Sequence, residues 1–152
     1  MSEMKRYRIG YTTGVFDLFH VGHLNLLERC KEQCEQLIVA VCTDEYAQES
    51  GKNPTIPYAD RARIVGALRC VDRVVPMEYT DKLKAWEQYR FDVLFSGDDW
   101  KGSERYRITQ EQFKPLGVDI VYFPYTTGVS TTQIRQKLNH NSSAITQPNT
   151  TK

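Results

Sequence analysis

Residues 13–23 read Thr13-Gly14-Val15-Phe16-Asp17-Leu18-Phe19-His20-Val21-Gly22-His23. They follow an apolar segment, 7–11, and precede the run 24–29, in which apolar residues recur at helical spacing. Gly14 lets the backbone turn tightly, so the pattern predicts a strand, a corner and a helix that begins near Val21. The free N–H groups at a helix start favour an anion, and His20 and His23, three residues apart, lean to the same side. We therefore expect a phosphate-binding corner.

Strand and helix patterns alternate along the rest of the chain. Apolar runs of strand length occupy 37–42, 74–75 with their flanks, 91–95 and 118–123, and helical patterns occupy 21–35, 58–70, 80–90, 104–115 and 130–139. Strands that are apolar on both faces are typical of a buried parallel sheet. The sequence therefore predicts an α/β protein, with a Rossmann-like open parallel sheet, helices on both of its faces and ligands beyond the carboxyl ends of the strands.

The bulk properties limit the class of protein. A chain of 152 residues is most simply one domain, 1–140, followed by a polar tail, 141–152, that we expect to be disordered. The 20 Lys and Arg residues nearly balance the 19 Asp and Glu residues, so there is no electrostatic case for nucleic-acid binding. No apolar run approaches the roughly 20 residues that span a bilayer, and no signal peptide is visible, so we expect a cytoplasmic protein without a membrane partner.

The four cysteines, Cys30, Cys34, Cys42 and Cys70, have no Cys-x-x-Cys spacing. Cys30 and Cys34 are four residues apart, but no second pair or nearby histidine completes a metal site. We therefore expect reduced thiols that pack as small apolar residues.

The His-x-Gly-His signature after a Gly-x-Phe-Asp turn resembles the nucleotidylyltransferase superfamily, and most closely its glycerol-3-phosphate cytidylyltransferase family. Further blocks stand in the order of that family: Thr43-Asp44-Glu45, Asp60-Arg61, Arg69-Cys70-Val71-Asp72, Ser96-Gly97-Asp98-Asp99-Trp100 and Gly128-Val129-Ser130-Thr131-Thr132. The resemblance implies a transfer of CMP from CTP to a small phosphorylated alcohol, most simply glycerol 3-phosphate. It also implies Mg²⁺ carried on the CTP phosphates without a metal site of the protein, and a homodimer.

The resemblance carries roles to matching positions. It implies His20, His23 and Lys52 as catalytic residues, and Asp17, Lys52 and Lys82 as acceptor-binding residues. The nucleotide-binding residues that it implies are Gly14, Val15, Phe16, His20, His23, Arg69, Tyr125, Thr126, Gly128, Val129, Ser130, Thr131 and Thr132. Arg61 and Arg69 are eight residues apart, which would place them on one face of the helix expected over 58–70.

The segment 125–132 departs from the family pattern Arg-Thr-Glu-Gly-Ile-Ser-Thr-Thr. Tyr125 stands where the family has arginine, and Thr127 where it has glutamate. Either another residue supplies the missing cation, or the enzyme takes a different nucleotide or acceptor. The candidates for that cation are Arg61, Lys101, Arg105 and Arg135. Ser50 likewise replaces one lysine of the family's loop, which leaves Lys52 to carry its charge alone.

Other functions are weighed against the same residues. A dinucleotide-binding oxidoreductase needs Gly-x-Gly-x-x-Gly, and only Gly14 precedes the first helix. A zinc site of Asp17, His20 and His23 would be short of ligands, because the third histidine, His140, is near the tail. Histidines that flank a glycine at a polar corner have little reason to be core residues. An adenylyltransferase that uses ATP and a nucleotide-binding regulatory module without turnover stay open.

Overall fold

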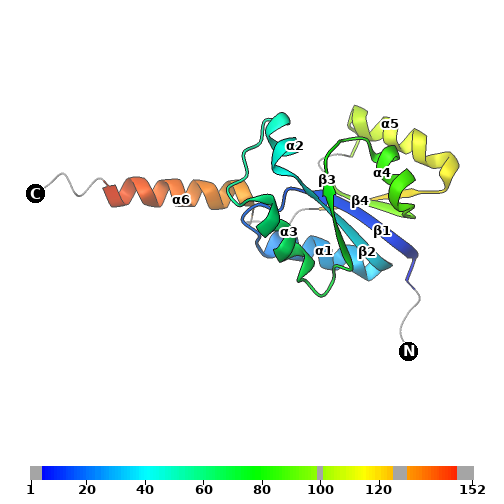
Figure 1. Cartoon of the computed structure of the whole chain (residues 1–152), viewed down its shortest axis with the longest axis horizontal. Helices are drawn as coiled ribbons and strands as arrows, with labels where there is room; N and C mark the ends of the chain where they lie inside the picture. Colours follow the sequence, from blue (N-terminus) through cyan, green and yellow to red (C-terminus); the bar gives the residue numbers. More distant parts are fainter. Residues whose placement is uncertain (1–4, 99–100, 125–129, 147–152) are drawn as a thin grey trace, which may run out of the picture.

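The computed structural model describes residues 5–98, 101–124 and 130–146, with side chains up to Asn139. In chain order the elements are β1 (Tyr7–Gly14), α1 (Val21–Gln33), β2 (Cys34–Cys42), α2 (Asp44–Glu49), α3 (Tyr58–Gly66), β3 (Arg73–Met77), α4 (Lys82–Tyr89), β4 (Val93–Gly97), α5 (Glu104–Phe113), the 3₁₀ turn η2 (Lys114–Leu116), β5 (Asp119–Phe123) and α6 (Thr131–Thr146). The strands form one parallel sheet in the order β3-β2-β1-β4-β5, with β1 at its centre (Figure 1). The predicted open parallel α/β fold is confirmed.

Helices cover both faces of the sheet, and β2 shows how its sequence produces this arrangement. Leu37, Val39 and Val41 lie in one core cluster with side chains of α1 and α3, whereas Ile38 and Ala40 lie in the other with side chains of α4 and α5. Successive strand residues point to opposite faces, so a strand apolar at every position can bury both. Cys30, Cys34 and Cys42 are buried among these apolar groups, as expected.

Three helices differ most from the sequence prediction. The helix expected over 58–70 ends at Gly66, and Ala67 begins a turn closed by hydrogen bonds from the N–H of Leu68 to Val65 and of Val71 to Leu68. Helix α2 was not predicted at all, because its six residues are too few to show a helical period. The helix predicted over 130–139 was too short, since α6 continues to Thr146.

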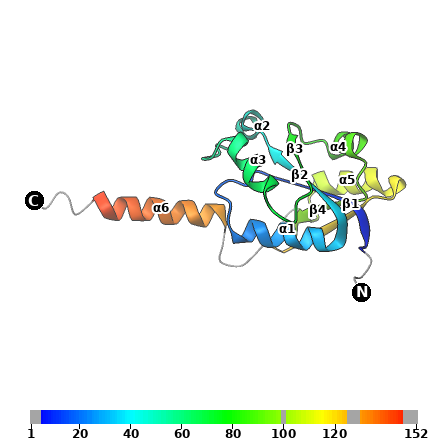
Figure 2. The same ribbon diagram turned by 60° about the horizontal axis from the view of Figure 1, so that its bottom comes forward.

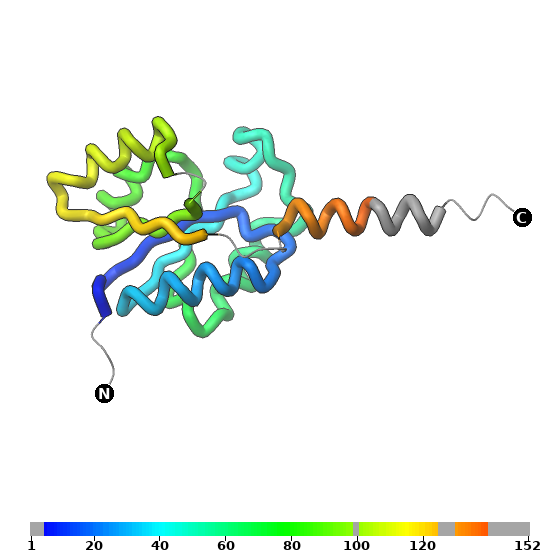
Figure 3. The backbone as a smooth tube through the Cα atoms, turned by 180° about the vertical axis from the view of Figure 1, so that it is seen from behind, coloured from blue at the N-terminus to red at the C-terminus, as the bar shows by residue number. Residues whose placement is uncertain are grey.

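Helix α6 leaves the body beside the start of α1 and runs outward (Figures 2 and 3). Residues 141–146 of the expected tail therefore belong to this helix, and 147–152 lie outside the described residues. Within the described ranges no helix has both the length and the apolar character that a membrane crossing requires.

Candidate active site

The corner between β1 and α1 lies at the carboxyl end of the central strand and has an unusual backbone. Phe16 and Leu18 both have positive φ angles, 56° and 50°, in the left-handed region that side chains other than glycine rarely adopt. Each such residue costs about 1–2 kcal/mol. Gly14 has to be a glycine for a related reason, because a Cβ there would lie only 2.7 Å from the Phe16 ring. The tight turn expected at Gly14 is therefore placed wrongly: Gly14 is still part of β1, the chain turns at Phe16–Leu18, and Gly14 is needed to make room for the Phe16 ring.

The two histidines cap the helix that follows. The Nδ1 atom of His20 accepts a hydrogen bond from the Gly22 N–H at 3.0 Å, and the Nδ1 atom of His23 accepts one from the His20 N–H at 3.2 Å. Their rings stack with centroids 3.9 Å apart, so the predicted common side is confirmed. Because each Nδ1 accepts, the hydrogen-bond network assigns the proton of each neutral ring to Nε2. The corner therefore holds two adjacent N–H donors.

Both histidines are held in the neutral state at pH 7. Burial lowers the pKa of His20, and burial together with the neighbouring His20 ring lowers the pKa of His23 to about 4, although the Asp17 carboxylate acts in the opposite direction. Neutral imidazoles with Nε2–H groups donate hydrogen bonds to phosphate oxygens without needing a second proton.

Asp17 ties three segments together. Its carboxylate accepts hydrogen bonds from the N–H groups of Thr55 and Ile56, at 2.8 and 2.9 Å, and pairs with Arg135 of α6. Burial raises the pKa of Asp17, but these hydrogen bonds and the Arg135 charge outweigh it and lower the pKa overall. The Asp17 side chain is only 3% exposed. Its carboxylate, which was expected to bind the acceptor, is therefore bonded to protein groups instead.

The start of α6 reaches the same corner. Thr131 donates a hydrogen bond from its Oγ1 to the backbone oxygen of Asp17 at 3.0 Å, and this Oγ1 lies 3.4 Å from Nε2 of His20. Ser130 caps the helix by accepting from the N–H of Gln133 at 3.1 Å. The structure therefore brings Ser130 and Thr131 opposite the histidines, whereas Thr132 is exposed. The predicted positions Tyr125, Thr126, Gly128 and Val129 lie outside the described residues.

Arg61 has a structural role that the sequence did not reveal. Its guanidinium is 1% exposed and donates to the carbonyl oxygens of Ile56, Val15 and Cys42 and to the Asp44 carboxylate, at 2.7–2.8 Å. All of its nitrogens are engaged within the protein, so Arg61 is excluded as the cation that replaces the family arginine. Arg61 instead holds two backbone carbonyl groups in place, that of Val15 in the corner and that of Cys42 at the end of β2.

Arg69 was wrongly placed on one helix face with Arg61. Because α3 ends at Gly66, Arg69 lies in the turn that leads back to β3. The chain must reverse there so that Val71 can enter the core and Asp72 can bond its N–H to the oxygen of Leu37 at 3.0 Å. No contact among the described residues joins Arg69 to the histidine corner.

Lys82 is buried at the start of α4, with 8% of its surface exposed. Among the described residues its ammonium has one weak acceptor, the Thr80 oxygen at 3.4 Å. Burial and the nearby Arg105 charge lower its pKa to about 8, although Asp81 and Cys42 act in the opposite direction. A buried ammonium beside a second cation favours an anionic ligand.

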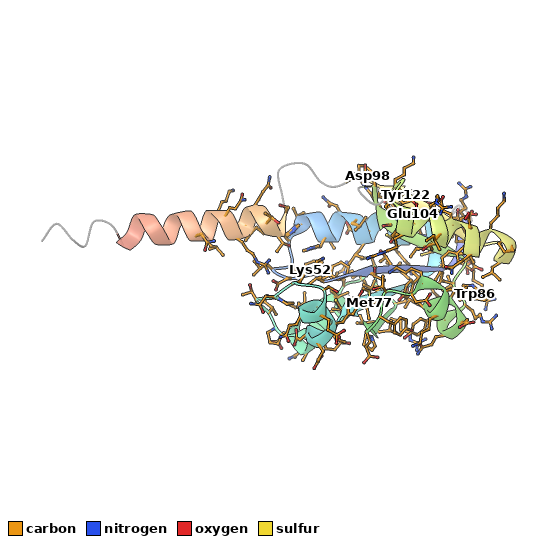
Figure 4. The ribbon with its side chains drawn as sticks, turned by 90° about the horizontal axis from the view of Figure 1, so that it is seen from above. Lys52, Met77, Trp86, Asp98, Glu104 and Tyr122 are labelled. Carbon is orange, nitrogen blue, oxygen red and sulfur yellow. The ribbon has the colours of Figure 1, made fainter. Side chains whose placement is uncertain are left out.

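Lys52 is exposed on the loop after α2, at the end of the body from which α6 leaves (Figure 4). Thr55 and Ile56 of the same loop bond to Asp17, so the loop is attached to the histidine corner.

In the described part of the chain no group of three or more His, Cys, Asp or Glu side chains is arranged to hold a metal ion. The groups that meet at the corner include the histidine N–H donors and the Arg135 guanidinium, which suit phosphate oxygens.

Comparisons with known proteins find related sequences and a similar fold. The cytidylyltransferase-like family matches residues 11–137. The glycerol-3-phosphate cytidylyltransferase of Bacillus subtilis (strain 168) is 37% identical over 134 residues, which cover 84% of this chain and 94% of that protein. The enzyme of the same name from Staphylococcus aureus (strain NCTC 8325 / PS 47) is 35% identical over 128 residues, which cover 84% and 92%. A crystal structure of the lipopolysaccharide core biosynthesis protein from Thermoplasma volcanium GSS1 superposes with a TM-score of 0.69 and 30% identity, and the match covers 79% of this chain and 98% of that one.

Proposed function

Because the chain belongs to the cytidylyltransferase-like family and is an enzyme of that class, we propose that it transfers CMP from CTP to a small phosphorylated alcohol. Glycerol 3-phosphate is the first candidate acceptor, since two relatives that cover most of this chain carry it in their names. An oxygen of the acceptor phosphate forms a bond to the α-phosphorus of CTP. The bond from that phosphorus to the α,β-bridging oxygen breaks, and the products are a CDP-alcohol and pyrophosphate.

The observation that carries this proposal is the pair of Nε2–H donors of His20 and His23. The attacking phosphate is already ionised at neutral pH, so the reaction needs positioned donors rather than a base. In the proposed reaction the two imidazoles donate to an α-phosphate oxygen and to the bridging oxygen, where negative charge grows as pyrophosphate leaves. Their low pKa values keep both rings in this donating, neutral form at pH 7.

Cations around the corner complete the site in this proposal. Lys52 lies between the phosphates of the two substrates, and Lys82 binds the acceptor phosphate. Arg135 is the cation that takes the place of the family arginine, because its pairing with Asp17 fixes it next to the histidines and 42% of its side chain stays exposed to a ligand. Asp17 then positions Arg135 and the Lys52 loop rather than touching the acceptor.

Magnesium fits this donor set as a partner of the nucleotide. The described residues offer donors rather than a carboxylate cluster, so Mg²⁺ would be held by CTP phosphate oxygens, whose charge it neutralises. We propose a homodimer from the family resemblance alone. The nucleotide contacts of Tyr125, Thr126, Gly128 and Val129 likewise stay a prediction.

Pyrophosphate release over a panel of nucleotides and phosphorylated alcohols tests the proposal. We expect turnover with CTP and glycerol 3-phosphate, with CTP preferred over ATP by at least about tenfold. A preference for ATP would make the chain an adenylyltransferase. Nucleotide binding without turnover on any acceptor of the panel would make it a regulatory module, and either result would contradict the proposal.

A further inference from the structure

The loop that carries Lys52 begins at a defined helix end. Helix α2 closes with two hydrogen bonds, from the N–H of Gly51 to the oxygen of Gln48 at 3.0 Å and from the N–H of Lys52 to the oxygen of Ala47 at 2.8 Å. This pair of bonds is the Schellman motif, in which the residue after the helix cap takes a left-handed conformation. Gly51 is that residue, with a φ of +83°. The backbone of Lys52 is therefore bonded directly to the helix.

The other end of the loop is anchored as well. The N–H groups of Thr55 and Ile56 donate to Asp17 at 2.8 and 2.9 Å, and the oxygen of Ile56 accepts from Arg61 at 2.7 Å. Only Asn53 and Pro54 lie between Lys52 and this second anchor. Lys52 thus extends from a short strap, residues 50–56, that is fixed at one end to α2 and at the other to the histidine corner.

Conformation, rather than space, requires a glycine at position 51. A Cβ built there would meet no atom within 4 Å, so a larger residue would not clash. The positive φ is the constraint, since it disfavours L-residues other than asparagine and aspartate. An alanine at 51 would favour a negative φ and pull Lys52 away from its bond to Ala47.

We infer that Gly51 is a positioning residue for catalysis, because it fixes the point from which Lys52 reaches the substrate phosphates. The inference rests on the proposed function, in which Lys52 contacts those phosphates. A lysine side chain is flexible along its whole stem, so the position of its backbone decides which phosphates its ammonium can reach. Gly51 touches no substrate itself and acts only through Lys52.

The chain offers a matched control in Gly117. This glycine also has a positive φ, +73°, and open space around its missing Cβ. It precedes β5, at the amino end of the parallel sheet, whereas the histidines lie at the carboxyl end. Gly117→Ala therefore introduces the same backbone strain away from the site.

The experiment compares Gly51→Ala, Gly51→Asn and Gly117→Ala with CTP and glycerol 3-phosphate. We expect both alanine variants to lower Tm by about 2–4 °C. Only Gly51→Ala should lower kcat, by about tenfold, and it should speed hydrogen exchange at the amides of residues 51 and 52. Gly51→Asn should restore kcat to within about threefold of the wild type, because asparagine tolerates the left-handed conformation.

Wild-type kcat in Gly51→Ala, equal kcat losses in the two alanine variants, or no rescue by asparagine would each overturn the inference. Lys52→Met separates this failure from that of the proposed function. A large loss of kcat in Lys52→Met with wild-type kcat in Gly51→Ala overturns the positioning role alone. Wild-type kcat in Lys52→Met removes Lys52 from the proposed mechanism, and the inference about Gly51 falls with it.

Discussion

Asp17 and Arg135 lie 118 residues apart in the sequence and form an ion pair in the structure. Asp17 stands between two left-handed residues in the corner after β1, and Arg135 is one helical turn beyond Thr131 in α6. The pair therefore joins the histidine corner to the helix whose first turn also contacts His20. Because Asp17 also accepts from the Lys52 loop, one carboxylate holds the three segments in register.

The first prediction concerns Arg135. Arg135→Gln should lower kcat/KM by about tenfold to a hundredfold, the range of one charge-assisted hydrogen bond of about 1.5–3 kcal/mol. The control is Lys137→Gln, an exposed cation on the same helix, which should stay within about twofold of the wild type. Steady-state kinetics with CTP measures both. Equal losses would show that the charge of α6, rather than the position of Arg135, matters.

The second prediction concerns Tyr125 and tests whether Arg135 replaces the family arginine as the cation of the site. Tyr125→Arg alone should leave kcat/KM unchanged or lower, because in the proposed mechanism Arg135 already supplies the cation for the triphosphate. In the Arg135→Gln background the same change should recover about tenfold. The four proteins form a double-mutant cycle, and additive effects would contradict the exchange of roles. A tenfold gain from Tyr125→Arg alone would mean that the wild-type site lacks a cation.

The third prediction tests the histidine donors. His23→Ala should lower kcat by about two to four orders of magnitude, because it removes a donor aimed at growing charge. Circular dichroism should show an intact fold, since the cap of α1 by His20 remains. His140→Ala, which changes the third histidine of the chain, should keep wild-type kcat. Near wild-type turnover of a folded His23→Ala protein would remove His23 from the mechanism.

The low pKa of His23 predicts how stability depends on pH. Its pKa in the folded state, about 4, lies below the ordinary value of 6.5, so the unfolded chain binds more protons between these values. The free energy of unfolding should therefore fall as pH drops from about 6.5 towards 4. Tm measured across this window should fall more steeply for the wild type than for His23→Gln, which cannot titrate. Identical slopes, or an NMR titration of His23 near pH 6.5, would contradict the pKa shift.

The fifth prediction compares two arginines of α3. Arg61→Met should lower the free energy of unfolding by about 2–4 kcal/mol, because the carbonyls of Val15, Cys42 and Ile56 lose a buried donor. Arg63→Met, on the exposed side of the same helix, should change it by less than about 0.5 kcal/mol. Urea denaturation measures both, and similar losses would refute the structural role of Arg61.

The sequence predicted the sheet and the histidine corner because both depend on local patterns. Apolar runs such as that of β2 read as buried parallel strands, and the three-residue spacing of His20 and His23 placed both rings on one side of a helix start. Two features could not be predicted from local patterns: that Arg61 binds protein carbonyl groups rather than a ligand, and that Asp17 pairs with Arg135. Each depends on groups far apart in the chain, and an arginine or aspartate looks the same in sequence whether it binds ligand or protein.

Two smaller signals were present but were not used. Arg135 follows Thr131 by four residues, which predicts a shared face of α6 and hence a place near the corner. Ser50-Gly51 after Glu49 fits a helix that ends with a left-handed glycine, which would have revealed the end of α2. Both signals are short, and they gain meaning only when the partner segment is known.

The outward course of α6 has a practical consequence for anyone who handles this enzyme. The helix has 16 residues, so it is a stiff rod about 24 Å long whose first turn bears on His20 and Asp17. A domain attached beyond its far end is joined through this helix to the histidine corner. Tyr7, where the central strand begins, lies at the opposite end of the sheet from the histidines. Affinity tags, surface linkers and fluorescent fusions therefore suit the amino terminus better, because a carboxyl-terminal attachment extends the helix whose first turn contacts His20 and Asp17.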